Sequence, residues 1–160
     1  MTKDEPTTYN ILFVCSGNTC RSPMAEAIAR RALHERGWTH VSVDSAGTGA
    51  TWGAPATESA RQAAAQIGLD LSGHRSQPLT PQLVEGSDII LGMTQTHVDT
   101  VTGLGTAQVS LLSEFIQGPH AGEPIADPVG GTIEDYREAR DRIARGIDGL
   151  LDRLSAILSP

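Results

Sequence analysis

Residues 11–23, ILFVCSGNTCRSP, place a strand, a loop and the start of a helix next to one another. The first four residues are apolar without alternation, which is typical of a strand buried on both faces of a parallel sheet. Ser22 and Pro23 predict the N-cap and first residue of a helix that continues to Gly37. Between strand and helix, Gly17 and Asn18 tolerate left-handed backbone conformations, so we expect a tight loop there.

The rest of the chain repeats this order of strand and helix. Strands are predicted at 41–43, 88–91 and 109–111, and helices at 57–67, 80–86 and 94–101. A capping box at Thr132 and Asp135 opens a long helix with apolar positions at a period close to 3.6. The pattern predicts an α/β fold: a four-stranded parallel sheet, doubly wound, with helices on both faces and a phosphate-binding loop after the first strand. We expect a flexible leader at 1–8 and a single domain at 9–160.

Composition limits the classes of function. The chain of 160 residues has a formal net charge of −7 and a sequence pI of about 5.1, which disfavours nucleic-acid binding and a peripheral membrane role. It has neither an apolar run of about 18 residues nor the pattern of a signal peptide, so no membrane span and no export are expected. Two cysteines without an export signal indicate a reducing, cytoplasmic location.

Cys15 and Cys20 by themselves allow three interpretations. Zinc binding needs four closely spaced ligands, and the five histidines show no matching spacing, so no metal is expected. A structural disulfide is disfavoured in a reducing compartment. A small buried cysteine at the end of a strand explains Cys15, but it does not explain the residues that follow.

Those following residues favour an anion site. A loop of this composition can turn successive N–H groups inward, and a helix N-terminus adds partial positive charge. The guanidinium of Arg21 matches two phosphate oxygens. These groups stabilise a thiolate as well as an oxyanion, so Cys15 is predicted to be nucleophilic near neutral pH. The predicted phosphate-binding residues are Ser16, Gly17, Asn18, Thr19, Cys20 and Arg21.

The stretch CSGNTCRSP at 15–23 resembles the signature of the low-molecular-weight protein tyrosine phosphatases, a cysteine followed by five residues, an arginine and a serine. Its position near the N-terminus, after an apolar strand and before SPMAE at 22–26, is similar too. Asp127-Pro128 matches the family's second signature, and DSAG at 44–47 and HRSQPL at 74–79 are also similar. The resemblance extends from Tyr9 to about Leu154.

The resemblance implies a catalytic mechanism without metal or cofactor. Cys15 would attack phosphorus to form a thiophosphate, while Arg21 and the loop amides hold the phosphoryl oxygens. Ser22 would donate a hydrogen bond to the Cys15 sulfur. Asp127 would protonate the leaving group and later deprotonate the attacking water. Three residues match a family network that holds the loop in shape: Asn18, Ser45 and His74.

Three branches of the family share this site. Thiol-dependent arsenate reductases need a further cysteine pair, which this chain lacks. Phosphotyrosine phosphatases commonly hold an apolar residue where Thr19 stands and aromatic residues after the Asp-Pro pair, although Trp52 could supply an aromatic wall. Protein-arginine phosphatases carry a threonine at the position of Thr19, and they are similar at four further segments, at 78–80, 91–94, 127–131 and 133–136. That branch usually has an aromatic residue where Val129 stands.

We therefore expect phosphorylated proteins as partners, with phosphoarginine the favoured substrate and phosphotyrosine the alternative. A non-catalytic binder of phosphoproteins is disfavoured because Cys15, Arg21 and Asp127 are all present. A further hypothesis is that oxidation of Cys15 is captured as a reversible disulfide with Cys20.

Overall fold

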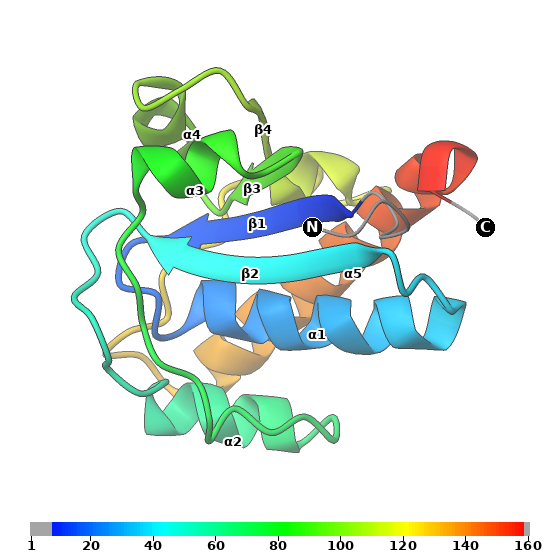
Figure 1. The fold of residues 1–160 in the computed structure, drawn as a ribbon. Coiled ribbons are helices and arrows are strands. Elements are labelled where there is room, and N and C mark those ends of the chain that lie inside the picture. Colours follow the sequence, from blue (N-terminus) through cyan, green and yellow to red (C-terminus); the bar gives the residue numbers. More distant parts are fainter. Residues whose placement is uncertain (1–7, 159–160) are drawn as a thin grey trace.

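The computed structural model describes residues 8–158 and contains one four-stranded parallel sheet (Figure 1). Its strands lie in the order β2-β1-β3-β4, so the first strand is central. The sheet strands are β1 Tyr9–Cys15, β2 Val41–Gly47, β3 Ile89–Gly92 and β4 Gln108–Leu111. The helices are α1 Arg21–Arg36, α2 Glu58–Ala65, α3 Pro81–Glu85, α4 Gln95–Thr102, the 3₁₀ helix Leu112–Phe115 and α5 Ile133–Leu158. The predicted parallel α/β fold is confirmed.

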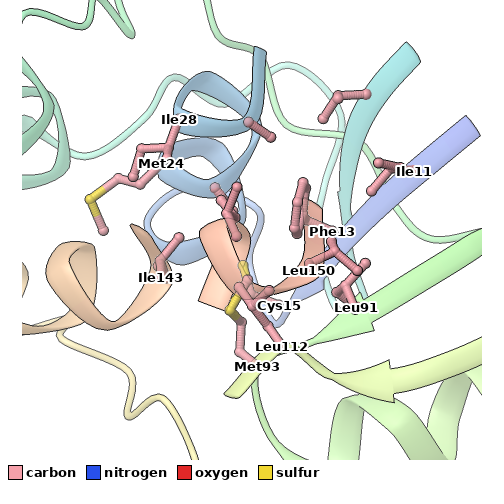
Figure 2. Packing of buried hydrophobic residues seen from close by; sticks show 14 of the residues in the cluster. Ile11, Phe13, Cys15, Met24, Ile28, Leu91, Met93, Leu112, Ile143 and Leu150 are labelled. Atoms are coloured by element: carbon pink, nitrogen blue, oxygen red, sulfur yellow. The ribbon is translucent and has the colours of Figure 1, made fainter. Parts of the chain in front are cut away.

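Helices cover both faces of the sheet (Figure 1). The larger core lies against α1, α2 and α5, and Figure 2 shows side chains of β1, α1, β3 and α5 meeting in it. A smaller core forms on the opposite face, where Leu12, Val14 and Ile90 lie together with residues of α3 and α4. Alternate residues of β1 therefore enter opposite cores, which explains why the strand has no polar face.

Most helix boundaries follow the predicted caps. Thr57 accepts a hydrogen bond from the Ala60 amide, and Thr80 accepts one from Leu83. The capping box that opens α5 is formed, since Thr132 and Asp135 each accept a hydrogen bond from the other's amide. Helix α2 ends at Ala65, two residues earlier than predicted.

Two boundaries near the first loop differ more. Helix α1 begins at Arg21, and Ser22 does not cap it, because the Ser22 hydroxyl contacts the Cys15 sulfur and the Asn18 amide instead. Strand β2 continues to Gly47 rather than ending at Val43, because it pairs with β1 along its whole length, up to the pair of Cys15 and Gly47.

The predicted leader lies outside the described residues except for Thr8, and the division into leader and domain stays a prediction. Among residues 8–158, no helix combines the length and apolar character needed to cross a bilayer.

Candidate active site

Cys15 ends β1, and the loop of residues 16–20 joins it to α1. The Cys15 side chain is buried, and its sulfur lies 2.9 Å from the Ser22 hydroxyl oxygen. The same oxygen accepts a hydrogen bond of 2.8 Å from the Asn18 side-chain amide. Because Ser22 accepts from Asn18, its own hydrogen is free to point at sulfur, the arrangement that stabilises a thiolate.

Asn18 holds the middle of the loop in place. Its φ of 55° lies in the left-handed region, and its side chain is fully buried. Besides Ser22, its amide nitrogen donates to the Ser45 hydroxyl at 3.0 Å, and its amide oxygen accepts from the Gln77 backbone at 2.9 Å. One side chain therefore ties the loop to α1, to β2 and to the segment around Gln77.

Ser45 and His74, which the family resemblance implied as support for the loop, both contact Asn18. Ser45 donates to Glu26 at 2.5 Å, so its oxygen is free to accept from Asn18. Nε2 of His74 lies 2.7 Å from the Asn18 carbonyl oxygen and must donate to it, because a carbonyl can only accept. All three predicted support residues meet at the loop.

Gly47 allows the loop and β2 to approach closely. A Cβ at this position would lie 2.5 Å from the Ser16 carbonyl oxygen and 2.9 Å from the Asn18 amide nitrogen. The residues after Gly47 fasten to the loop, since Thr48 N–H donates to Cys15 and Gly49 N–H donates to Ser16, both at 2.9 Å. The expected similarity at 44–47 thus marks a site of close backbone contact.

Arg21 is the first residue of α1 and is 3% exposed. Its guanidinium donates to the Ile125 carbonyl at 2.8 Å and lies 3.6 Å from an Asp127 carboxylate oxygen. Its Nε is buried and has no hydrogen-bond partner within residues 8–158. A buried guanidinium with an unpaired donor at a helix N-terminus favours binding of an oxyanion.

His97 belongs to the site, and sequence reasoning missed it. Its Nε2 lies 2.9 Å from the Ser16 hydroxyl, and its ring is buried at the start of α4. Burial, followed by the charge of Arg21, lowers the pKa of His97 to about 4, although the Asp127 carboxylate acts in the opposite direction. The sequence signal for His97 was its position three residues after Thr94, the spacing of a capping box, in which the side chain contacts the backbone at the helix N-terminus.

Cys20 points into a small cluster of hydroxyl groups. Its sulfur lies 3.4 Å from Thr57 Oγ1 and 3.6 Å from the Tyr136 hydroxyl. Burial raises the pKa of the Tyr136 hydroxyl. Both cysteines are free thiols, and Cys20 is held by α2's cap and by α5.

Two exposed apolar side chains follow segments that contact the loop or Arg21, and we call them the acceptor rim: Trp52 and Val129. Trp52 is 73% exposed in the segment after β2, and Val129 is 60% exposed. The Val129 amide donates to Asp127 at 3.0 Å, which orients that carboxylate beside Arg21. Thr19 is half-buried. Its hydroxyl oxygen would lie 3.4 Å from a Cβ added at Gly17, so the hydroxyl lies next to Gly17 in the loop.

A family model described as "Low molecular weight phosphotyrosine protein phosphatase" matches residues 10–158. The chain belongs to this family. A protein-arginine-phosphatase of Bacillus subtilis is 39% identical over 137 residues, which cover 84% of this chain and 89% of the relative. A probable low molecular weight protein-tyrosine-phosphatase, EpsP of Ralstonia nicotianae, is 40% identical over 147 residues, covering 92% and 97%. The solved YwlE arginine phosphatase from Geobacillus stearothermophilus superposes with a TM-score of 0.79 at 35% identity, covering 92% and 94%.

Membership of the low molecular weight phosphatase family gives the loop its chemical meaning. The chain is a cysteine-dependent protein phosphatase that acts on phosphorylated proteins, and the loop after β1 is its phosphate-binding loop. These matches favour a phosphatase over the arsenate reductase and the non-catalytic binder.

Proposed function

We propose that this phosphatase removes phosphate from arginine side chains of proteins. The observation that carries the proposal is Thr19, which offers a hydroxyl in the loop where the phosphotyrosine branch commonly holds an apolar residue. Every aromatic residue of the chain lies within residues 8–158, and Trp52 is the one whose side chain is exposed. A hydroxyl at Thr19 and a carboxylate at Asp127 suit a planar, cationic guanidinium better than a phenyl ring, which packs best on apolar walls.

In the first step, the Cys15 thiolate attacks phosphorus and the bond from phosphorus to the guanidine nitrogen breaks. Arg21 and the loop amides hold the phosphoryl oxygens, where negative charge lies in the transition state. Asp127, half-exposed and 3.6 Å from Arg21, gives its proton to the departing nitrogen. The Ser22 hydrogen bond keeps Cys15 anionic before attack.

In the second step, water attacks the phosphorus of the thiophosphate and the bond from sulfur to phosphorus breaks. Asp127, now a carboxylate, takes the proton of that water. Ser22 stabilises the thiolate that leaves, since its hydrogen already faces the sulfur. To the Thr19 hydroxyl we assign the orientation of the attacking water or of the guanidinium.

Overall identity to relatives does not choose between the two substrates. The arginine phosphatase of Bacillus subtilis and the EpsP phosphatase of Ralstonia nicotianae are 39% and 40% identical to this chain. The choice therefore rests on the residues that contact the phosphorylated side chain. Phosphotyrosine is the second candidate, because Trp52 is exposed and free to stack on a phenol.

The test is phosphate release under reducing conditions from two peptides of one sequence, which carry phosphoarginine or phosphotyrosine at the same position. We expect kcat/KM for phosphoarginine to be at least about 10-fold higher. A preference for phosphotyrosine would overturn the proposal and assign the aromatic wall to Trp52.

Thr19→Ile tests the role of the hydroxyl in that preference. The variant should move the ratio of kcat/KM values toward phosphotyrosine by about 10-fold, because it replaces a polar contact by an apolar one. Thr39→Ile is the matched control, since Thr39 is exposed between α1 and β2. An unchanged ratio in Thr19→Ile would refute the selectivity role of Thr19.

A further inference from the structure

Ser16, the first loop residue after the nucleophile, is held from two directions. Its carbonyl oxygen accepts a hydrogen bond of 2.9 Å from Gly49 N–H, in the segment after β2. Its hydroxyl lies 2.9 Å from His97 Nε2, on α4. Ser16 is nevertheless exposed, so these two hydrogen bonds hold a residue that remains accessible to solvent.

The hydrogen bonds of His97 determine which atom of this pair donates. The Thr94 backbone N–H donates to Nδ1 at 3.2 Å, so Nδ1 carries no hydrogen in the neutral ring. Nε2 then carries the hydrogen and donates it to the Ser16 oxygen. A pKa of about 4 keeps the ring neutral at neutral pH. The Ser16 hydroxyl consequently acts as an acceptor toward His97, and its own hydrogen is available to another partner.

The connection from β3 to α4 supports the far end of the loop as well. Met93, between the two elements, donates to Val14 of β1 at 3.3 Å and accepts from Ile125 at 2.9 Å. The Ile125 carbonyl in turn accepts from Arg21. The chain from β3 into α4 thus reaches both ends of the predicted phosphate-binding residues 16–21. It contacts Ser16 through His97 and is linked to Arg21 through Ile125.

We propose that His97 is a positioning residue for phosphoryl transfer, which aligns the Ser16 hydroxyl as an additional hydrogen-bond donor to the phosphoryl group. Ser16 directly follows Cys15, so the hydrogen bond from His97 acts on the loop residue next to the nucleophile. The inference rests on the proposed phosphatase mechanism but not on the choice of phosphoarginine. It assigns a role to a loop side chain that no other step uses.

The experiment is a double-mutant cycle with Ser16→Ala, His97→Ala and the double variant, measured on p-nitrophenyl phosphate with inorganic phosphate as competitor. Each single variant should lower kcat/KM by about 10- to 100-fold and weaken competition by phosphate. The double variant should be no worse than the worse single variant, because His97 acts only by aligning the Ser16 hydroxyl, which Ser16→Ala already removes. His97→Gln, which retains an N–H near Nε2, should recover part of the loss. Ser113→Ala, a buried hydroxyl in the 3₁₀ helix, serves as control and should leave activity unchanged.

Full activity in Ser16→Ala, or losses that multiply in the double variant, would overturn the proposal, since His97 would then act through the fold rather than through Ser16. If His97→Ala fails to fold, Ser16→Ala and His97→Gln still decide the question, because Ser16 is exposed and Gln preserves the donor. If the wild-type protein hydrolyses neither p-nitrophenyl phosphate nor a phosphopeptide, the phosphatase assignment itself fails, which is a separate result.

Discussion

The phosphate-binding loop and the acceptor rim meet at one end of the sheet but are built in opposite ways. In the loop and at its two ends, Asn18, Cys15 and Arg21 are 0%, 2% and 3% exposed, and their side chains contact partners from several elements. In the rim, Trp52 and Val129 are 73% and 60% exposed. Because several contacts hold each of these buried residues, we expect the substitution of any one of them to lower stability or activity. The rim can vary with little effect on folding, so we infer that it contributes, together with Thr19, to the choice of substrate.

The largest expected effect is that of Cys15→Ser. Replacing the sulfur by a hydroxyl removes the thiolate, and we expect kcat to fall by roughly 10⁴-fold or more with either phosphopeptide. The unfolding midpoint should change little, because serine is close to cysteine in size and Ser22 can still contact it. Phosphate release and thermal unfolding measure the two quantities. Undiminished hydrolysis of any phosphoester would falsify the catalytic assignment.

Asn18→Ala should have the largest effect on stability. It removes three side-chain hydrogen bonds from a fully buried position and places an alanine at φ 55°. We expect a loss of about 3 to 5 kcal/mol in the free energy of unfolding, measured by denaturant titration, together with a large loss of activity.

Asn18→Gly separates the backbone from the side-chain network. Glycine accepts the left-handed conformation without strain, so this variant should recover about 1 kcal/mol relative to alanine while activity stays low. Equal stability of the two variants would show that backbone conformation contributes little to holding the loop.

The lowered pKa of His97 predicts how the free energy of unfolding depends on pH in the acidic range. Its pKa is lowered to about 4 in the folded protein from an ordinary value of 6.5, because burial disfavours the charged ring. The unfolded chain then binds a proton that the folded chain does not, so stability falls as pH decreases from about 6.5 to about 4. The loss from this group should reach about 3 kcal/mol at the lower pH.

The measurement is the free energy of unfolding between pH 4 and pH 7 for wild type and His97→Gln. The variant lacks the titrating ring, so the difference between the two proteins should change by about 3 kcal/mol over this range. A constant difference would mean that His97 titrates equally in the folded and unfolded states.

The same contrast explains what the sequence could predict. The apolar run of β1, the glycine and asparagine of the loop and the Thr132 capping box act locally, so strand, loop and long helix were predicted close to their observed bounds. The support of Asn18 by Ser45 and His74 was expected only through family resemblance, because these residues lie 27 and 56 positions away. His97 contacts Ser16 across 81 positions, and its role depends on the fold bringing β1 and β3 together. Ser22 was predicted as a helix cap, but the tertiary contact with Cys15 takes precedence over the local preference.

A smaller effect is expected on the rate at which Cys20 forms a disulfide with Cys15. Its sulfur contacts Thr57 and Tyr136, and it must leave both before it can bond to Cys15. Tyr136→Phe removes one weak hydrogen bond, so a disulfide should form about 2- to 5-fold faster after mild peroxide treatment. Intact-mass analysis of alkylated protein follows the reaction. A sulfinic acid at Cys15 with no disulfide would refute the hypothesis that oxidised Cys15 is captured by Cys20. An unchanged rate of disulfide formation in Tyr136→Phe would show that Tyr136 does not restrain Cys20.

The smallest effect is expected at the rim. Trp52 is 73% exposed, so Trp52→Ala should leave the unfolding midpoint unchanged and alter kcat/KM for the phosphoarginine peptide by no more than about 2-fold. Ile157→Ala is the matched control, because Ile157 is 74% exposed near the end of α5 and belongs to neither the loop nor the rim. A substantially larger loss with the phosphotyrosine peptide than with phosphoarginine would identify Trp52 as a stacking wall for phenyl rings. A large loss with both peptides would mean that the rim contributes to phosphoryl transfer itself, and the division between a fixed loop and a variable rim would then not hold.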